Sequence, residues 1–179
     1  LPAIPLLTFA GYVLASGKSS QRLVRAYKSM FGWMPGGMAL MVVFVCGLFT
    51  TFTGASGVTI LALGGLVYPM LIKDGYPSGF SLGLVTAAGS LGLLFPPSLP
   101  VILYAVAASA PGSVAPVGVE QLYIGGLIPG TVLVLLVSLY GIHQGIRAKA
   151  PRQAFARAEL GSALWQAKWD LLLPVVVVL

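Results

Sequence analysis

The sequence is poor in charge. Of its 179 residues only 10 are Lys or Arg and 4 are Asp or Glu, so that 8% are charged, whereas a soluble domain carries about a quarter. This scarcity excludes an ordinary soluble domain, and the mean hydropathy of +0.96 indicates an integral membrane protein. The apolar runs are long and lack strict alternation with polar residues, which favours membrane helices over an outer-membrane barrel.

Reactive side chains are also scarce. The single cysteine, Cys46, excludes an internal disulfide and a cysteine-based metal cluster. Away from their ends, the apolar segments contain no Asp, Glu, Lys, Arg or His, and His143 lies near the end of one of them. Their interiors therefore lack a proton-relay carboxylate and the ligands or dyads of an intramembrane hydrolase. We expect a protein that is not an enzyme and that holds no cofactor.

The net charge of +6 could indicate nucleic-acid binding. The positions of the basic residues argue against nucleic-acid binding. They fall in connections between apolar segments, and the connection 111–121 has none. By the positive-inside rule, the connections 17–33, 73–77 and 147–168 are predicted to be cytoplasmic and 111–121 periplasmic.

The first predicted region is residues 1–34. Leu1 to Ala15 is apolar but short for a span of roughly 20 residues, so we interpret it as the end of a helix. Residues 17–33 alternate basic and apolar side chains, which predicts an amphipathic helix lying at the membrane surface. An ordinary loop is the alternative.

Residues 35–73 are apolar but divided in the middle by small and hydroxyl residues. The two arms, Met38 to Phe49 and Ile60 to Ile72, hold about a dozen residues each, and at about 1.5 Å per residue they are too short for a membrane core of about 30 Å. Both ends of the region adjoin basic connections. We therefore favour a re-entrant helical hairpin with its tip at Thr53 to Gly57, over two tilted full spans.

A second interrupted helix is predicted over residues 78–110. Pro96, Pro97 and Pro100 lie near its middle, and a helix-interior proline leaves the carbonyl four residues earlier without its N–H partner. In hydrocarbon such a break persists only where it is buried in protein or lines a polar cavity. One half-helix should end near Leu94 and the next begin near Ser98, so that opposite ends of two helix dipoles meet. The carbonyls expected to be freed are those of Gly92, Leu93 and Pro96.

Residues 111–146 are predicted to form an outer loop and a full-span helix. Gly125, Gly126 and Gly130 with Pro129 indicate close helix contact or a kink near its outer end. Residues 147–179 are a basic connection followed by the start of another apolar run, which we interpret as part of a longer permease.

The polar atoms expected at membrane depth belong to the backbone and to hydroxyl groups. Clustered at two helix breaks, such oxygen ligands suit a hard cation, Na⁺ before a transition metal. The hydroxyl residues concerned are Thr50, Thr51, Thr53, Ser56, Thr59, Thr86, Ser90 and Ser98.

Three motifs carry a resemblance to a known family. They are the small-residue tip GASGVT, the GY turn, and the PPS-x-P break, the last two within YPMLIKDGYPSGFSLGLVTAAGSLGLLFPPSLPVILYAVA. Together they resemble the large membrane subunit of TRAP transporters, tripartite ATP-independent carriers, over essentially the whole chain. The tip departs from the family pattern at Thr53, Ala55 and Gly57.

The resemblance implies one repeat of an elevator-type, all-α transporter, with the second repeat absent from this chain. Residues 35–110 would belong to a mobile transport domain, and the helices entered at 1–34 and 147–179 to a scaffold. Sodium would be bound by the tip and the break, and the substrate would lie near Ser56, Pro97 and Ser98. The sodium-binding residues so implied are Thr53, Gly54, Ala55, Ser56, Gly57, Gly92, Phe95 and Pro96.

The same resemblance implies a function and partners. The protein would take up a small organic anion, such as a C4-dicarboxylate or a sialic acid, across the bacterial inner membrane. Its partners would be a small membrane subunit and a periplasmic binding protein. The alternative is a related sodium-coupled carrier that works without a binding protein.

Overall fold

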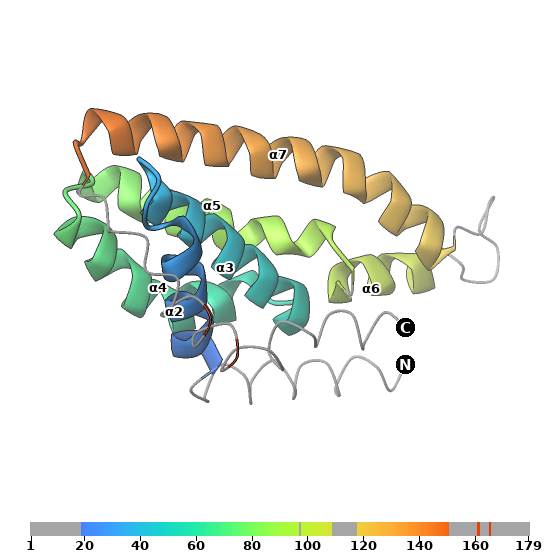
Figure 1. Cartoon of the computed structure of the whole chain (residues 1–179). Coiled ribbons are helices and arrows are strands. Elements are labelled where there is room, and N and C mark those ends of the chain that lie inside the picture. The colour runs from blue at the N-terminus through green and yellow to red at the C-terminus, as the bar shows by residue number, and fades with distance from the viewer. Residues whose placement is uncertain (1–18, 97, 109–117, 151–160, 162–164, 166–179) are drawn as a thin grey trace.

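The computed structural model describes residues 19–96, 98–108, 118–150, 161 and 165, and its regular structure there is helical (Figure 1). The all-α membrane architecture is thereby confirmed. The expectations for 1–15, for the loop 111–117, for most of 151–179 and for Pro97 lie outside the described residues. The elements are α2 (Ser19–Phe31), α3 (Gly37–Thr53), α4 (Ser56–Lys73), α5 (Ser78–Leu91), η1 (Gly92–Leu94), α6 (Leu99–Ala108) and α7 (Val119–Arg147).

Helix α2 has the amphipathic character expected for this part of the chain. Leu23, Val24 and Ala26 are buried, and α2 packs on α3 and α4. Tyr27 stacks on Phe31, and both rings stack on Phe44 of α3. These contacts fix α2 against the hairpin through its apolar face; its position at a membrane surface remains a prediction.

Helices α3 and α4 form a hairpin joined by Gly54 and Ala55 alone. Gly54 has φ +62° and its N–H donates to the Thr50 carbonyl, a left-handed helix end that glycine adopts without steric cost. The arms contain 17 and 18 residues, so the prediction of about a dozen residues was wrong. The hydroxyl residues on both sides of Gly54 continue the helices instead of forming an irregular loop.

The proline-rich break is observed between α5 and α6. Helix α5 ends at Leu91, tightens into η1 over Gly92–Leu94, and α6 begins at Leu99. The two halves are bent by 46°. The end near Leu94 and the restart near Ser98 were predicted from the prolines, which remove the N–H groups that would continue the helix.

Helix α7 returns along α5 and α6 for its full length (Figure 1). Gly126 and Gly130 approach Leu94 and Phe95 of the break so closely that an added Cβ would lie 3.0–3.4 Å from them. Gly125 makes no such contact within 4 Å. The predicted close packing of the glycines therefore holds for two of the three.

A second glycine contact lies at the other end of α7. A Cβ on Gly141 would be 2.8 Å from the Ala39 Cβ, and one on Gly145 would be 2.4 Å from the Gly36 Cα. Small residues on both helices let the backbones touch, which is how membrane helices associate where lipid supplies no hydrophobic drive. The sequence reasoning missed this contact.

Within the part of the chain that the structure describes, two helices are long and apolar enough to cross a membrane, α4 and α7, and α5–η1 with α6 makes a third if the bent pair counts as one span. Helix α3 is apolar but shorter. Since α4 by itself is long enough to span the membrane, the length of the arms no longer favours a re-entrant hairpin over two full spans. The depth that the hairpin reaches in the membrane stays a prediction.

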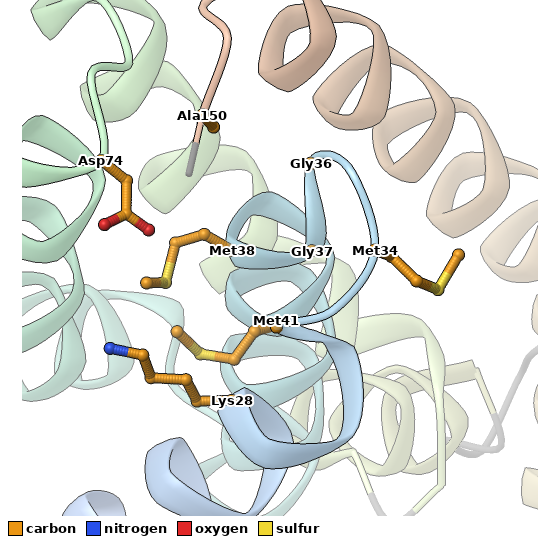
Figure 2. A pocket seen from close by; sticks show the side chains of 9 residues that line it. Lys28, Met34, Gly36, Gly37, Met38, Met41, Asp74 and Ala150 are labelled. Atoms are coloured by element: carbon orange, nitrogen blue, oxygen red, sulfur yellow. The ribbon is translucent and has the colours of Figure 1, made fainter. Parts of the chain in front are cut away.

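A charged corner forms where the α4–α5 turn meets α2 (Figure 2). Lys28 and Asp74 line the same small crevice, with Met38 and Met41 beside them. Burial raises the pKa of the Asp74 carboxyl above its ordinary value, and the charges of Lys28 and Lys73 pull it in the opposite direction without cancelling the effect. This corner places the C-terminal end of α4 beside α2.

Candidate functional site

The hairpin tip and the proline break lie against each other. A Cβ on Gly92 would be 2.1 Å from the Gly47 carbonyl oxygen and 2.7 Å from the Thr50 Cβ, so the break touches the α3 backbone. A Cβ on Gly54 would be 2.7 Å from the Leu99 Cβ, at the start of α6. The two helix breaks singled out from the sequence are therefore brought together in space.

Three buried threonines lie at this junction. Thr50 and Thr59 have no exposed surface, and Thr53 is 2% exposed. The Thr50 Oγ1 lies 2.8 Å from the Thr59 Oγ1, 2.8 Å from the Gly89 carbonyl oxygen and 2.9 Å from the Cys46 carbonyl oxygen. One hydroxyl thus links α3, α4 and α5 at ordinary hydrogen-bond distances.

The other oxygens of the cluster are more widely spaced. The Thr53 Oγ1 is 3.2 Å from the Thr59 Oγ1, and each of these is 3.4 Å from the Ala55 carbonyl oxygen. Hydroxyl hydrogen bonds prefer about 2.7–2.8 Å, so these three oxygens form a nearly equilateral triangle too open for strong mutual hydrogen bonding. We call it the oxygen triangle.

The dimensions of the oxygen triangle suit a hard cation. Oxygens held about 2.4 Å from an ion of the size of Na⁺ or Ca²⁺ lie about 3.4 Å apart along the edge of an octahedron. No carboxylate belongs to the triangle, which disfavours a divalent ion because its charge would be uncompensated in a buried site. Among the described residues no group of three His, Cys, Asp or Glu could hold a metal.

Two of the three carbonyls predicted to be freed at the break, those of Gly92 and Leu93, accept hydrogen bonds within the protein. The Gly92 carbonyl accepts the Phe95 N–H at 3.2 Å and the Thr51 hydroxyl at 3.3 Å. The Leu93 carbonyl accepts the Ser98 hydroxyl at 2.6 Å. These side chains replace the helical N–H groups that the prolines cannot supply.

Phe95 and Pro96 line an apolar groove beside the junction rather than the oxygen triangle. The groove has a volume of about 300 Å³ and also touches Tyr27, Phe44 and Thr51. Of the eight residues predicted for sodium, Thr53 and Ala55 contribute to the triangle, whereas Phe95 and Pro96 face the groove.

Ser98 is fully buried at the start of α6. Its backbone N–H donates to the Tyr123 phenol oxygen at 2.9 Å, and the Tyr123 hydroxyl donates to the Ser98 carbonyl at 3.2 Å. Tyr123 therefore anchors the N-terminal end of α6 to α7. Sequence reasoning did not single it out, although a tyrosine inside an apolar span is a signal because its hydroxyl needs a partner there.

The remaining predicted residues are placed as follows. Ser56 and Gly57 begin α4, the first half-buried and the second exposed. Thr86 and Ser90 are exposed on α5, and their hydroxyls donate to carbonyls four residues earlier in their own helix. Thr50 and Thr59 were recognised as polar residues at depth but were not assigned to the site, because the sequence does not show which hydroxyls converge.

Comparison with known proteins gives matches along the whole chain. A family described as "Tripartite ATP-independent periplasmic transporter, DctM component" matches residues 1–179. The chain is similar to the isethionate TRAP transporter permease protein DctMQ of Oleidesulfovibrio alaskensis, with 34% identity over 98% of this chain and 27% of that protein.

Two further relatives are large permease proteins. The C4-dicarboxylate permease DctM of Vibrio cholerae is 33% identical over 99% of this chain and 38% of its own length. The 2,3-diketo-L-gulonate permease YiaN of Escherichia coli is 27% identical over 99% of this chain and 40% of its own length. The chain thus spans well under half the length of the curated relatives it matches. Since the family match runs from the first residue to the last, the chain belongs to the DctM component of the tripartite ATP-independent periplasmic transporters.

Proposed function

We propose that the protein takes part in sodium-coupled uptake of a small organic anion across the bacterial inner membrane. The observation that carries the proposal is the oxygen triangle of Thr53, Ala55 and Thr59 at the meeting point of two helix breaks. Its oxygens are uncharged and spaced for a monovalent hard cation; two belong to the buried Thr53 and Thr59, and the third to the half-buried Ala55. Gly54, Ser56 and Gly57 neighbour the triangle in the chain, and Gly92 packs on Gly47 and Thr50 of α3; the family resemblance is the ground for including these four residues in the proposed sodium site.

The substrate class is proposed from the helix ends and the relatives together. Helix α6 directs the positive end of its dipole at the break, which favours an anionic group near Ser56, Pro97 and Ser98. Relatives are named for C4-dicarboxylates, isethionate and 2,3-diketo-L-gulonate, each of which carries a carboxylate or a sulfonate. A carboxylate or sulfonate on a small polar molecule is the proposed common feature, and a sialic acid has it as well.

The proposed partners are a small membrane subunit and a periplasmic binding protein that delivers the substrate. The family description, a tripartite periplasmic transporter, supports them. The transport domain would move by the elevator scheme, in which the hairpin and the broken helix shift together across the membrane. Their mutual contacts at Gly92, Gly54 and Gly89 support such a common movement.

The sodium site is tested by thermal unfolding of the purified full-length permease. The midpoint is measured against NaCl concentration at constant ionic strength, with KCl replacing NaCl. Sodium binding to the folded state raises the midpoint, and Thr53→Val should shift the response to about 5–30-fold higher sodium, as expected for a ligand worth about 1–2 kcal/mol. Ser56→Ala tests the adjoining hydroxyl in the same way.

Thr131→Val is the matched control. Its hydroxyl is exposed on α7 and donates only to the Leu127 carbonyl, so its sodium response should equal that of the wild type. A sodium response that survives unchanged in Thr53→Val would remove the oxygen triangle from the ion site. Uptake of labelled succinate and isethionate in sodium or potassium buffer then tests the transport reaction itself.

A further inference from the structure

A trough runs between α5 and α7, outside the candidate sodium site. Its apolar part has a volume of about 440 Å³ and is bordered by Gly79, Gly83 and Ala87 of α5 and by Val137 and Tyr140 of α7. Helix α7 returns antiparallel to α5 (Figure 1), so its C-terminal end lies beside the start of α5. The three α5 residues are exposed, and this part of the trough therefore opens to the surface of the bundle.

Small side chains on α5 create the apolar part of the trough. Gly79, Gly83 and Ala87 recur every four residues, which places them on one face of the helix. A Cβ added to Gly79 or Gly83 would have nothing within 4 Å, so no close backbone contact requires either glycine. The rings of Phe80 and Tyr140 meet edge to face between the two helices, with centroids 5.6 Å apart. The ring contact joins α5 to α7 here, and the small residues leave an apolar space beside it.

The polar part of the trough lies at the C-terminal end of α7. It has a volume of about 380 Å³ and is bordered by Gln144 and Arg147 of α7 and by Gly75 and Pro77 of the α4–α5 turn. The two parts adjoin, because the Gln144 Nε2 donates to the Tyr140 phenol oxygen at 3.0 Å. The trough is therefore apolar along α5 and ends beside a cationic side chain.

The polar end offers Arg147 to an anion. Arg147 is exposed, and among the described residues no carboxylate borders either part of the trough. Asp74 points instead into the crevice that it shares with Lys28 (Figure 2). The last carbonyls of α7 accept the N–H groups of residues 148–150 at 2.8–3.1 Å, so they do not need the guanidinium. A guanidinium presents parallel N–H donors that match the oxygens of a phosphate group.

The length of the trough fits one leaflet of a bilayer. From Gly79 to Ala87 helix α5 rises by about 12 Å, at about 1.5 Å per residue. Half of a membrane core of about 30 Å is about 15 Å. On the predicted topology, Arg147 lies at the cytoplasmic surface, where the leaflet carries anionic lipids. An acyl chain and a phosphate headgroup therefore match the two parts in both length and order.

We propose that the trough between α5 and α7 binds an anionic phospholipid of the cytoplasmic leaflet. Its phosphate lies on Arg147 and Gln144, and an acyl chain lies along Gly79, Gly83 and Ala87. A membrane helix packed on the three small residues is the rival occupant, but such a helix would leave the cationic end unused. The proposal does not depend on the sodium site.

The experiment measures the thermal-unfolding midpoint of the purified full-length permease in detergent. Dioleoylphosphatidylglycerol or dioleoylphosphatidylcholine is added in separate titrations. A lipid that binds the folded state raises the midpoint, and phosphatidylglycerol should do so much more strongly than phosphatidylcholine. Arg147→Gln should need about tenfold more phosphatidylglycerol for half of the stabilisation, because a charge-assisted contact is lost. Gly83→Leu, which fills the apolar part, should weaken the response at least as much.

Arg25→Gln and Gly65→Leu are the matched controls. Arg25 is exposed on α2, and Gly65 is exposed on α4 with nothing within 4 Å of an added Cβ. Neither residue borders the trough. Both variants should keep the half-maximal phosphatidylglycerol concentration within about twofold of the wild type, as expected for surface substitutions away from a binding site.

Several results would overturn the inference. An absent response to phosphatidylglycerol, or an equal response to phosphatidylcholine, would remove the anionic-lipid site. An equal weakening by Arg25→Gln and Arg147→Gln would mean that general surface charge is responsible. Unchanged binding in Gly83→Leu would remove the acyl chain from the trough.

Two further measurements identify the rival occupants. If potassium phosphate alone stabilises the protein and Arg147→Gln abolishes that effect, the polar end is a site for a free anion rather than for a lipid. If Gly83→Leu lowers the midpoint already in lipid-free detergent while Gly65→Leu does not, the trough holds a packed helix of the transporter. Either result overturns the lipid site.

Discussion

The phenol of Tyr123 both accepts the backbone N–H of Ser98 and donates to its carbonyl, at 2.9 and 3.2 Å. A single side chain of α7 thus satisfies both backbone groups of the residue that precedes α6. Since Ser98 follows two prolines, it lies where the helix has just been broken and where backbone groups most need partners. Tyr123 therefore stabilises the restart of the helix.

Tyr123→Phe should lower the stability of the full-length permease by about 1–3 kcal/mol, the cost of leaving the buried Ser98 N–H unpaired, whereas the Ser98 carbonyl keeps the Ile102 N–H as a donor. The measurement is the thermal-unfolding midpoint in detergent. Tyr140→Phe is the control, because the Tyr140 hydroxyl is exposed on the same helix and only accepts a bond from Gln144. Equal effects of the two variants would contradict the anchoring role.

Gly92→Ala should be strongly destabilising. Gly92 has an ordinary helical φ of −64°, so the cost comes from space: the new Cβ would lie 2.1 Å from the Gly47 carbonyl oxygen. Overpacking of this kind costs about 1–3 kcal/mol or more, and the junction of the two breaks should open. The amount of folded protein recovered in detergent is the measurement.

Gly83→Ala provides the comparison for Gly92→Ala. Gly83 lies in α5, the helix that leads into Gly92, and nothing lies within 4 Å of its added Cβ. Alanine should be tolerated there, with a change within about 1 kcal/mol that helix propensity alone would make favourable. A loss of folded protein similar to that of Gly92→Ala would mean that the close contact at the break is not the cause.

Asp74→Asn tests the charged corner. The pKa of Asp74 is raised in the folded protein by burial, so the folded state holds the proton more tightly than the unfolded state. Stability from this group is therefore present at low pH and is lost as the pH rises from the ordinary carboxyl pKa through the folded one.

The asparagine variant lacks this pH-dependent loss. Its melting temperature should exceed that of the wild type at pH 7 and approach it at pH 3–4, measured on the same detergent-solubilised protein. If the variant is less stable than the wild type at pH 7 and equal to it only in acid, the difference in melting temperature has the opposite sign and the prediction is wrong. The attraction between Lys28 and the Asp74 carboxylate would then outweigh the cost of burial.

The depth of the hairpin is tested by labelling. A cysteine at the exposed Lys73, in a protein whose Cys46 has been replaced by alanine, should react with a membrane-impermeant maleimide only from the cytoplasm. A cysteine at Val117 should react only from the periplasm. Reaction of position 73 from the periplasm would rule out a re-entrant hairpin and favour two full spans.

The positions of the helices and of both breaks could be predicted because prolines and glycines act locally. Pro96 removes an N–H wherever it stands, and Gly54 allows a left-handed helix end that other residues resist. The lengths of the hairpin arms could not be predicted. Thr50 and Thr59 were placed between the two arms, in the tract of small and hydroxyl residues, whereas their hydroxyls hydrogen-bond to each other across the hairpin and the helices continue through them.

The composition of the site was predicted less well, for a related reason. The sequence shows which hydroxyls lie at similar depth, but not which ones face one another across three helices. Thr53 and Thr59 form one edge of the triangle because only two residues join α3 to α4, and Thr86 and Ser90 face outward on α5. Likewise Gly141 and Gly145 are significant only through Ala39 and Gly36, which are about a hundred residues away in the chain.

The brevity of the turn at Gly54 and Ala55 would limit how fast an ion enters or leaves the proposed sodium site. Two residues contribute only four soft torsion angles, too few for the tip to swing aside by itself as a long loop would on a nanosecond timescale. Opening the oxygen triangle therefore requires whole helices to shift against each other, and such motions take microseconds to milliseconds. Ion exchange at this site should accordingly be slow and governed by the movement of α3, α4 and α5, rather than by local fluctuation of the tip.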